Sequence, residues 1–228
     1  MKVMLFNGSP RKSGNTGTLL KKTAEGAKLA GADDAKTIHL YDYDYKGCYS
    51  CFQCKKIGGS SYGKCGIKDG ITSVIEEARQ ADVLIFGSPI YFGNLSGMMR
   101  NFLERLLFAA FVYDEAYSSL WQKEVKSGMI YTQNRASNEA YLDAMDYSVE
   151  FFLRCVFGNV ESMYSMDTYQ FNDYSKYFCP AFDEAQKRQV RDTVLDVYKR
   201  QLQGPFLSAS HRITVINTGA LHFIYTGF

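Results

Sequence analysis

The sequence predicts an α/β fold: a doubly wound parallel sheet of five strands in the order 2-1-3-4-5, with helices on both faces. Two short runs, VMLF at 3–6 and VLIF at 83–86, are continuously apolar, as strands buried on both faces are. Strand-like and helix-like segments alternate along the chain, which is typical of parallel sheets. Composition shifts nowhere sharply along the 228 residues, so one large domain is expected.

The elements follow one another as strand–helix pairs. A helix is expected over 17–30, because leucines and alanines recur there at helical spacing and Gly31 offers a stop. Gly87-Ser88-Pro89 should end the strand at 83–86. The remaining expected elements are a strand at 36–41, a loop at 42–68, a helix at 70–80, a helix at 96–112, a strand at 128–131, a helix at 138–156, a strand at 160–164 and a helix at 182–198.

The last 27 residues do not fit this pattern. DVYKRQ at 196–201 matches the translation of one reading frame of a common transposon sequencing adaptor. We therefore expect a domain over 1–201 and a tail of doubtful origin over 202–228. The alternative interpretation is a genuine C-terminal strand at 213–217 on the edge of the sheet.

Charge and hydropathy exclude several classes of protein. A net charge of +2 argues against a dedicated nucleic-acid binder. The longest apolar run, 106–112, is far too short to span a membrane, and the N-terminus is too short for a signal peptide. A cytoplasmic protein with reduced thiols is expected. Seventeen tyrosines among the aromatic residues suit flat ligands or subunit interfaces, and Tyr113–Trp121 is the candidate interface segment.

The loop GSPRKSGNT at 8–16 joins a buried strand to a helix and predicts an anion site. The first N–H groups of a helix have no partner within the helix and lie at its positive end. Ser9 and Thr16 add hydroxyls, Arg11 adds charge and Asn15 adds an amide. The spacing fits neither a Walker A loop nor GxGxxG, so a mononucleotide monophosphate is the natural ligand. The alternative is a polar turn capped by Asn15 or Thr16.

Three motifs occur in order along the chain: this loop, the run CxxCxxC at 48–54 and the segment GSPIYFGNLSGMMRNFLERL at 87–106. In these motifs the sequence resembles the flavodoxin-like NAD(P)H-dependent FMN reductases. The iron–sulfur flavoproteins are a branch of that family. The resemblance runs from residue 1 to about 195. It implies a flavodoxin-like fold, FMN as cofactor, NAD(P)H as co-substrate and a homo-oligomer, a dimer or tetramer. With FMN as the ligand, the anion site at the start of the helix predicts its phosphate at Ser9, Arg11, Asn15 and Thr16.

The loop after the second buried strand is the expected flavin platform. Tyr91 and Phe92 offer an apolar face for the isoalloxazine, and Gly93 allows close approach of the main chain. The resemblance assigns the flavin ring to Pro89, Ile90, Tyr91, Phe92, Gly93 and Asn94. A third loop, 132–135, is placed to reach the flavin's pyrimidine edge through Thr132, although helix capping explains its residues equally well.

Four cysteines, Cys48, Cys51, Cys54 and Cys65, have spacings of two, two and ten residues. Iron–sulfur clusters demand four thiolates around a compact cluster, whereas zinc prefers two separated pairs. Because the last gap is longer than is usual in the iron–sulfur branch, plain thiols without a metal are favoured over a cluster, and a cluster over zinc. Arg105 is expected to form an ion pair on a helix surface.

No catalytic side chain is predicted, since flavin chemistry needs no protein nucleophile. His39 lies in an expected strand and is taken as structural. The predicted function is an FMN-dependent oxidoreductase that transfers hydride from NAD(P)H to a small-molecule acceptor such as a flavin, quinone, azo or nitro compound. The alternative is an electron-transfer flavoprotein, with or without an iron–sulfur cluster; a flavin-free binding module of the same fold is a third interpretation.

Overall fold

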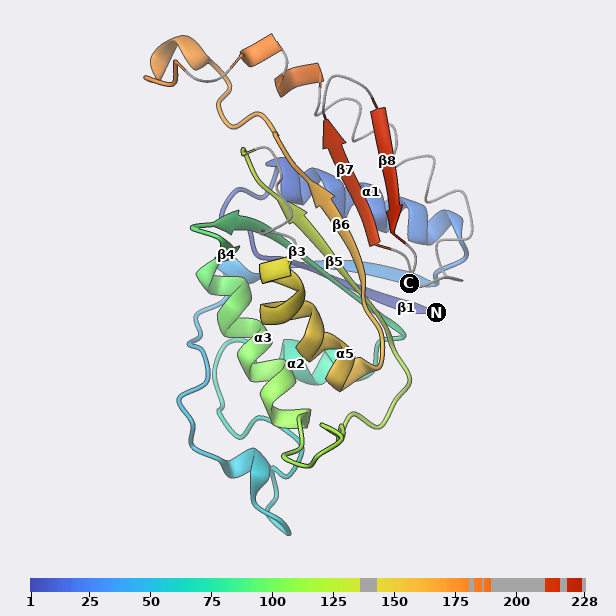
Figure 1. Ribbon diagram of the computed structural model, residues 1–228. Helices are drawn as coiled ribbons and strands as arrows, with labels where there is room; N and C mark the ends of the chain where they lie inside the picture. Colours follow the sequence, from blue (N-terminus) through green and yellow to red (C-terminus); the bar gives the residue numbers. More distant parts are fainter. Residues whose placement is uncertain (136–142, 181–182, 186, 190–211, 218–220, 227–228) are drawn as a thin grey trace.

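The computed structural model describes residues 1–135, 143–180, 183–185, 187–189, 212–217 and 221–226. Figure 1 shows a twisted sheet with helices on both of its faces. Its strands are β1 (Lys2–Asn7), β2 (Asp34–His39), β3 (Val83–Tyr91), β4 (Asn94–Leu95), β5 (Lys126–Thr132), β6 (Glu161–Ser165), β7 (Arg212–Asn217) and β8 (Leu221–Thr226). The main helices are α1 (Asn15–Leu29), α2 (Thr72–Ala78), α3 (Gly97–Ala110) and α5 (Phe151–Phe157).

The strand order confirms the predicted topology. The sheet runs β2-β1-β3-β5-β6, and all neighbours in this part are parallel. These are the five predicted strands in the order 2-1-3-4-5. The order reverses at β1, so the carboxyl ends of β1 and β3 border the place where ligands bind in such sheets.

Each face of the sheet has its own apolar core, because successive side chains of a strand point to opposite faces. Met4 and Phe6 of β1 belong to the core under α2, α3 and α5. Val3 and Leu5 belong to a smaller core under α1, with Leu19 and Leu20 from that helix. The continuous apolar run of β1 is thereby explained, since both of its faces are covered (Figure 1).

Helix α1 ends as the sequence predicts. Gly31 has φ +89°, and the N–H of Ala32 donates to Ala27 O at 2.9 Å, which is a glycine-terminated helix end. The helix expected over 138–156 is seen as a turn of π-helix, η3 (Asp146–Glu150), leading into α5; residues 136–142 lie outside the described ones. Most of the helix expected over 182–198 also lies outside them. No helix of the described residues has the length and apolarity needed to cross a membrane.

The sheet continues beyond β6 into the C-terminal segment. β7 pairs with β6 in parallel, and β8 pairs with β7 antiparallel. β7 covers the strand at 213–217 that the sequence offered as the alternative interpretation of the tail, although β8, and not β7, is the outermost strand. The domain boundary at 201 stays a prediction: a chain truncated there is expected to remain folded, and an insoluble product would assign the tail to the domain.

Candidate functional site

A pocket lies where four strands end at the carboxyl edge of the sheet. Its volume is about 140 Å³. The last residues of β3 and β5 line it, together with the segments that follow β1, β5 and β6: Ser9, Arg11, Asn15, Thr16, Pro89, Ile90, Tyr91, Thr132, Gln133, Asn134, Thr168, Tyr169 and Gln170. The structure thus brings together eight of the eleven residues that the sequence singled out. Phe92, Gly93 and Asn94 are not among the lining residues.

The loop after β1 folds tightly onto the start of α1. A Cβ on Gly17 would lie 1.9 Å from Lys12 O, so the loop approaches the helix closely only because residue 17 is a glycine. Gly14 occupies the N-cap position, and no side chain caps the helix there. The first turn also contains no acidic residue. Among the described residues, the positive end of α1 is therefore open to an anionic group.

The loops after β1 and β3 are held together by a buried serine. Ser96 Oγ donates to Gly8 O at 2.5 Å and accepts from Met99 N at 3.3 Å, so it caps α3 and anchors the first loop at once. A backbone hydrogen bond, which Gly8 N donates to Gly87 O at 2.8 Å, also connects the two segments. The positions of the two loops are consequently fixed relative to each other.

The end predicted for the second buried strand is wrong. β3 continues through Ser88-Pro89-Ile90 to Tyr91 and turns back into β4, with Tyr91 paired to Asn94. Phe92 and Gly93 form the two-residue turn, with φ of 50° and 78°. Turns of this kind match the twist of the flanking strands, which is why the strand runs on past Gly87. Phe92 is fully exposed at the tip.

The segment after β5 places buried polar side chains beside the pocket. Thr132 Oγ1 lies 2.7 Å from Thr16 Oγ1, a buried contact between the third loop and α1. Beside it, Gln133 Nε2 and Asn134 Oδ1 are buried and have no hydrogen-bond partner among the described residues. Such groups cost free energy unless something pairs with them. A ligand with both acceptors and donors in this pocket would satisfy them.

A fourth segment, after β6, closes the pocket. Arg11 Nη1 donates to Gln170 O at 2.7 Å, and Asn15 Nδ2 donates to Tyr169 O at 2.8 Å. Thr168 Oγ1 donates to Gln133 O at 3.0 Å. No motif in the sequence predicted this segment, although β6 is parallel to β5 and its carboxyl end had to reach the same edge.

A buried lysine supports the third and fourth segments from behind. The Lys187 side chain is 3% exposed and lies 2.6 Å from Asp167 Oδ1. Its Nζ also donates to Asn134 O at 2.8 Å.

His39 lies at the end of β2, with Nδ1 3.1 Å from Asn7 Nδ2, as expected of a structural histidine.

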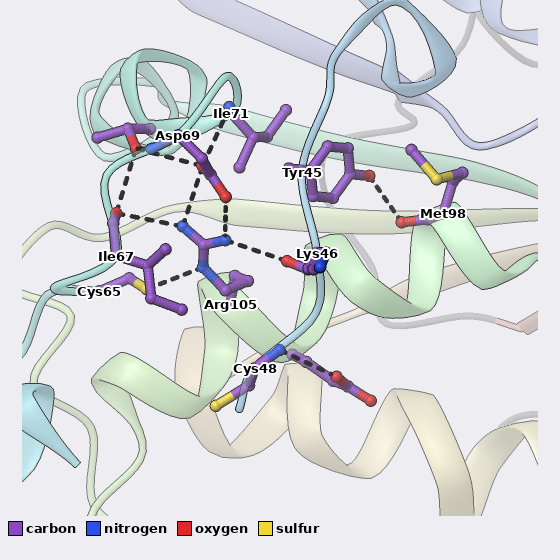
Figure 2. Close-up of polar contacts among 11 residues, drawn as sticks. Tyr45, Lys46, Cys48, Cys65, Ile67, Asp69, Ile71, Met98 and Arg105 are labelled. Carbon is purple, nitrogen blue, oxygen red and sulfur yellow. Dashed lines mark hydrogen bonds and ion pairs between the residues drawn. The ribbon is translucent and has the colours of Figure 1, made fainter. Parts of the chain in front are cut away.

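Arg105 is not on a helix surface, contrary to the sequence prediction. Figure 2 shows it between the segment with Lys46 and Cys48 and the segment from Cys65 to Asp69. Its side chain is 0% exposed. Nη1 and Nη2 donate to the two carboxylate oxygens of Asp69 at 2.7 and 3.3 Å, and Nε donates to Cys65 Sγ at 2.9 Å. Burial raises the pKa of Asp69, but the hydrogen bonds and charge of Arg105 outweigh burial and hold it below its ordinary value.

The cysteines of this loop are all free thiols. Cys48 N donates to Glu104 Oε2 at 3.3 Å, and burial raises the pKa of the Cys54 thiol. Among the described residues, no three His, Cys, Asp or Glu side chains lie together as metal ligands would. Cys65 is instead engaged by Arg105, so this arrangement does not fit a four-thiolate cluster without rearrangement.

Residues 1–144 match the family described as NADPH-dependent FMN reductase. This match spans more than half of the chain, and the chain belongs to that family. The resemblance stated from the sequence is thereby confirmed.

The similarities to individual proteins agree with this assignment. An iron-sulfur flavoprotein of Archaeoglobus fulgidus is 42% identical over 105 residues, which are 46% of this chain and 48% of that protein. The chain spans about half the length of the curated relatives it matches. The fold is similar to that of the NAD(P)H:quinone oxidoreductase from Methanothermobacter marburgensis, with a TM-score of 0.62, 16% identity and coverage of 89% and 96%. It is also similar to that of an azoreductase from Bacillus anthracis, with a TM-score of 0.60, 15% identity and coverage of 89% and 98%.

Proposed function

We propose that this chain is an FMN-dependent oxidoreductase that takes hydride from NAD(P)H and passes the electrons to a small-molecule acceptor. The observation that carries the proposal is the pocket where β1, β3, β5 and β6 end. It combines an uncapped helix start with buried amide atoms that have no hydrogen-bond partner in the described part of the chain. Membership in the FMN reductase family supports the same cofactor.

The phosphate of FMN is proposed to lie at the start of α1. Ser9, Asn15 and Thr16 supply hydrogen-bonding groups there, and Arg11 supplies a positive charge. Arg11 and Asn15 now donate to the carbonyl oxygens of Gln170 and Tyr169. A phosphate is a stronger acceptor than a carbonyl and would compete for these donors.

The flavin ring is proposed to lie against the end of β3. Pro89, Ile90 and Tyr91 line the pocket, and Tyr91 is 42% exposed, so part of its ring is free to meet a flat ligand. The hairpin tip, Phe92-Gly93-Asn94, borders this platform. Thr132 and Gln133, which also line the pocket, are proposed to supply polar groups to the edge of the ring. When bound, FMN supplies the hydride and electron chemistry, and the chain's own residues bind and orient it.

The most direct test is anaerobic mixing of FMN-loaded protein with NADH and, separately, NADPH, followed by the absorbance of the flavin. Bleaching by either nucleotide supports the proposal. Bleaching only by a reduced carrier protein would favour the electron-transfer alternative, and failure of FMN to bind would overturn both. Iron and acid-labile sulfide, measured on protein purified without oxygen, decide whether Cys48, Cys51, Cys54 and Cys65 hold a cluster.

A homo-oligomer in the cytoplasm is part of the proposal. Tyr113 and Tyr117 are 67% and 47% exposed, and Phe111 contacts both rings. Exposed aromatic rings are enriched at protein interfaces, so the Tyr113–Trp121 segment remains the candidate surface. Light scattering at micromolar concentration should give at least a dimer; a monomer would contradict it.

A further inference from the structure

The two segments that follow β5 and β6 are joined to each other by main-chain hydrogen bonds. Gln133 N donates to Ser165 O at 3.0 Å, and Thr168 N donates to Gln133 O at 3.0 Å. Asp167 N donates to Arg135 O at 3.1 Å. A side chain that fixes one of these segments therefore also fixes the other.

Asp167 holds its segment in a conformation that is uncommon for a residue with a side chain. Its φ is +54°, in the left-handed region. Such a backbone persists only where its surroundings hold it in place. The Asp167 carboxylate is held by Lys187, whose Nζ lies 2.6 Å from Oδ1. The same Nζ donates to Asn134 O at 2.8 Å, so Lys187 bridges the two segments.

Net stability does little to explain why this ion pair is buried. The side chains of Lys187 and Asp167 are 3% and 18% exposed, and the cost of removing two charges from water largely offsets their attraction. Lys187 does not line the pocket, whereas Asn134, whose carbonyl it holds, does. Asn134 Oδ1 is buried and has no hydrogen-bond partner among the described residues. Lys187 thus holds the main chain of a residue whose side chain is available to a ligand.

We propose that Lys187 is a positioning residue for the flavin: by fixing the main chain of Asn134, it sets the place of the Asn134 side chain in the pocket. The inference rests on the proposed function, in which FMN occupies this pocket. The pyrimidine edge of a flavin carries a ring N–H between two carbonyl groups, so it needs an acceptor as well as donors. Asn134 Oδ1 supplies that acceptor. Lys187, which does not line the pocket, acts through Asn134.

Titration with FMN, followed by flavin fluorescence, tests this role. Lys187→Met is expected to raise the Kd for FMN about fivefold or more, the value of one hydrogen bond. Lys123→Met is the matched control. Lys123 Nζ makes the same two kinds of contact, with Asp82 Oδ1 at 2.7 Å and Gln80 O at 2.8 Å, but none of these three residues lines the pocket. This control should bind FMN as the unchanged protein does.

A double-mutant cycle separates positioning from a general loss of structure. If Lys187 acts through Asn134, the Lys187→Met/Asn134→Ala protein binds FMN about as tightly as Asn134→Ala alone. Lys187→Met combined with Arg11→Ala should instead multiply the two losses, because Arg11 serves the phosphate. Multiplied losses in both pairs, or unchanged FMN affinity in Lys187→Met, would overturn this inference and leave the proposed function intact. Absence of FMN binding to the unchanged protein would overturn both.

Circular dichroism shows whether each variant is folded before the titration. If Lys187→Met does not fold, Lys187→Met/Asp167→Asn takes its place in the same cycle, because removing both charges leaves no uncompensated ion in the interior. Asparagine also tolerates the left-handed backbone at position 167. The expectation is the same, a Kd for FMN raised about fivefold or more. Unchanged FMN affinity in this variant would equally overturn the inference.

Discussion

The cluster around Arg105 and the pocket around Gln133 are both polar and both largely buried, yet the chain uses their hydrogen-bonding groups differently. Arg105 has five N–H donors, and five acceptor contacts surround it, from Asp69 (both oxygens), Cys65 Sγ, Lys46 O and Ile67 O. In the pocket, Gln133 Nε2 and Asn134 Oδ1 have no partner among the described residues. A saturated buried cluster holds the fold together, whereas an unsaturated one at strand ends indicates a ligand site.

The largest effect is expected from Arg105→Ala. Removing one member of a buried ion pair costs about 3–5 kcal/mol, because Asp69 and two backbone carbonyls lose their donor. Urea unfolding should show this loss. Arg100→Ala on the same helix is the matched control, since Arg100 is 45% exposed and its nitrogen lies 3.5 Å from Glu104; it should cost about 0–1 kcal/mol. Equal losses in the two variants would contradict a structural role specific to Arg105.

The next largest effect is expected on binding and not on stability. Arg11→Ala should weaken FMN binding with little change in the free energy of unfolding. Losing a charge-assisted contact costs about 1.5–3 kcal/mol, so the Kd for FMN should rise roughly tenfold or more. Lys12→Ala is the control, because Lys12 pairs with Asp42 and does not line the pocket. Unchanged FMN affinity in both Arg11→Ala and Thr16→Ala would remove the phosphate assignment.

A smaller effect concerns Glu161, at the opposite end of the sheet. Burial raises its pKa to about 7, although Lys126 lowers it. The folded protein therefore keeps a proton that the unfolded chain, with an ordinary pKa of 4.5, releases, and stability falls as pH rises from 4.5 to 7. Glu161→Gln should flatten this slope and stabilise the protein above pH 7 by about 1–2 kcal/mol, after allowance for solvent screening.

Urea unfolding at several pH values checks the Glu161 prediction, with the exposed Glu115→Gln as control. Identical slopes for the unchanged protein and Glu161→Gln would contradict it. Because Glu161 begins β6 whereas the pocket lies where β6 ends, FMN affinity should not change in this variant.

The fold could be predicted from the sequence because parallel strands buried on both faces appear as short, continuous apolar runs. The apolar runs of β1 and β3 and the alternation of elements were enough to order the sheet and to bring three loops to one edge. The segment after β6 was missed because its residues, Thr168 to Gln170, show no motif of their own. Their place follows from topology: any strand parallel to β5 ends at the same edge.

Local packing was harder to predict than topology. The continuation of β3 to Tyr91 depends on the tight turn at Phe92-Gly93, and only the glycine gave a signal for it. Arg105 looked like a surface residue because an ion pair on the surface of a helix was enough to explain its charge. Its actual partner, Asp69, lies 36 residues away in the chain, and a long loop had to fold over α3 to bring them together.

In the proposed site, the buried Nε2 of Gln133, which has no hydrogen-bond partner among the described residues, serves a ligand and not the fold. Gln133→Met tests this role in two assays: urea unfolding of flavin-free protein and FMN binding. We expect unchanged or higher stability, because an unpaired buried N–H group is removed, together with FMN binding weakened about fivefold to tenfold, the value of one hydrogen bond. Lower stability with unchanged FMN affinity would show that the amide serves the fold and would contradict the proposed role.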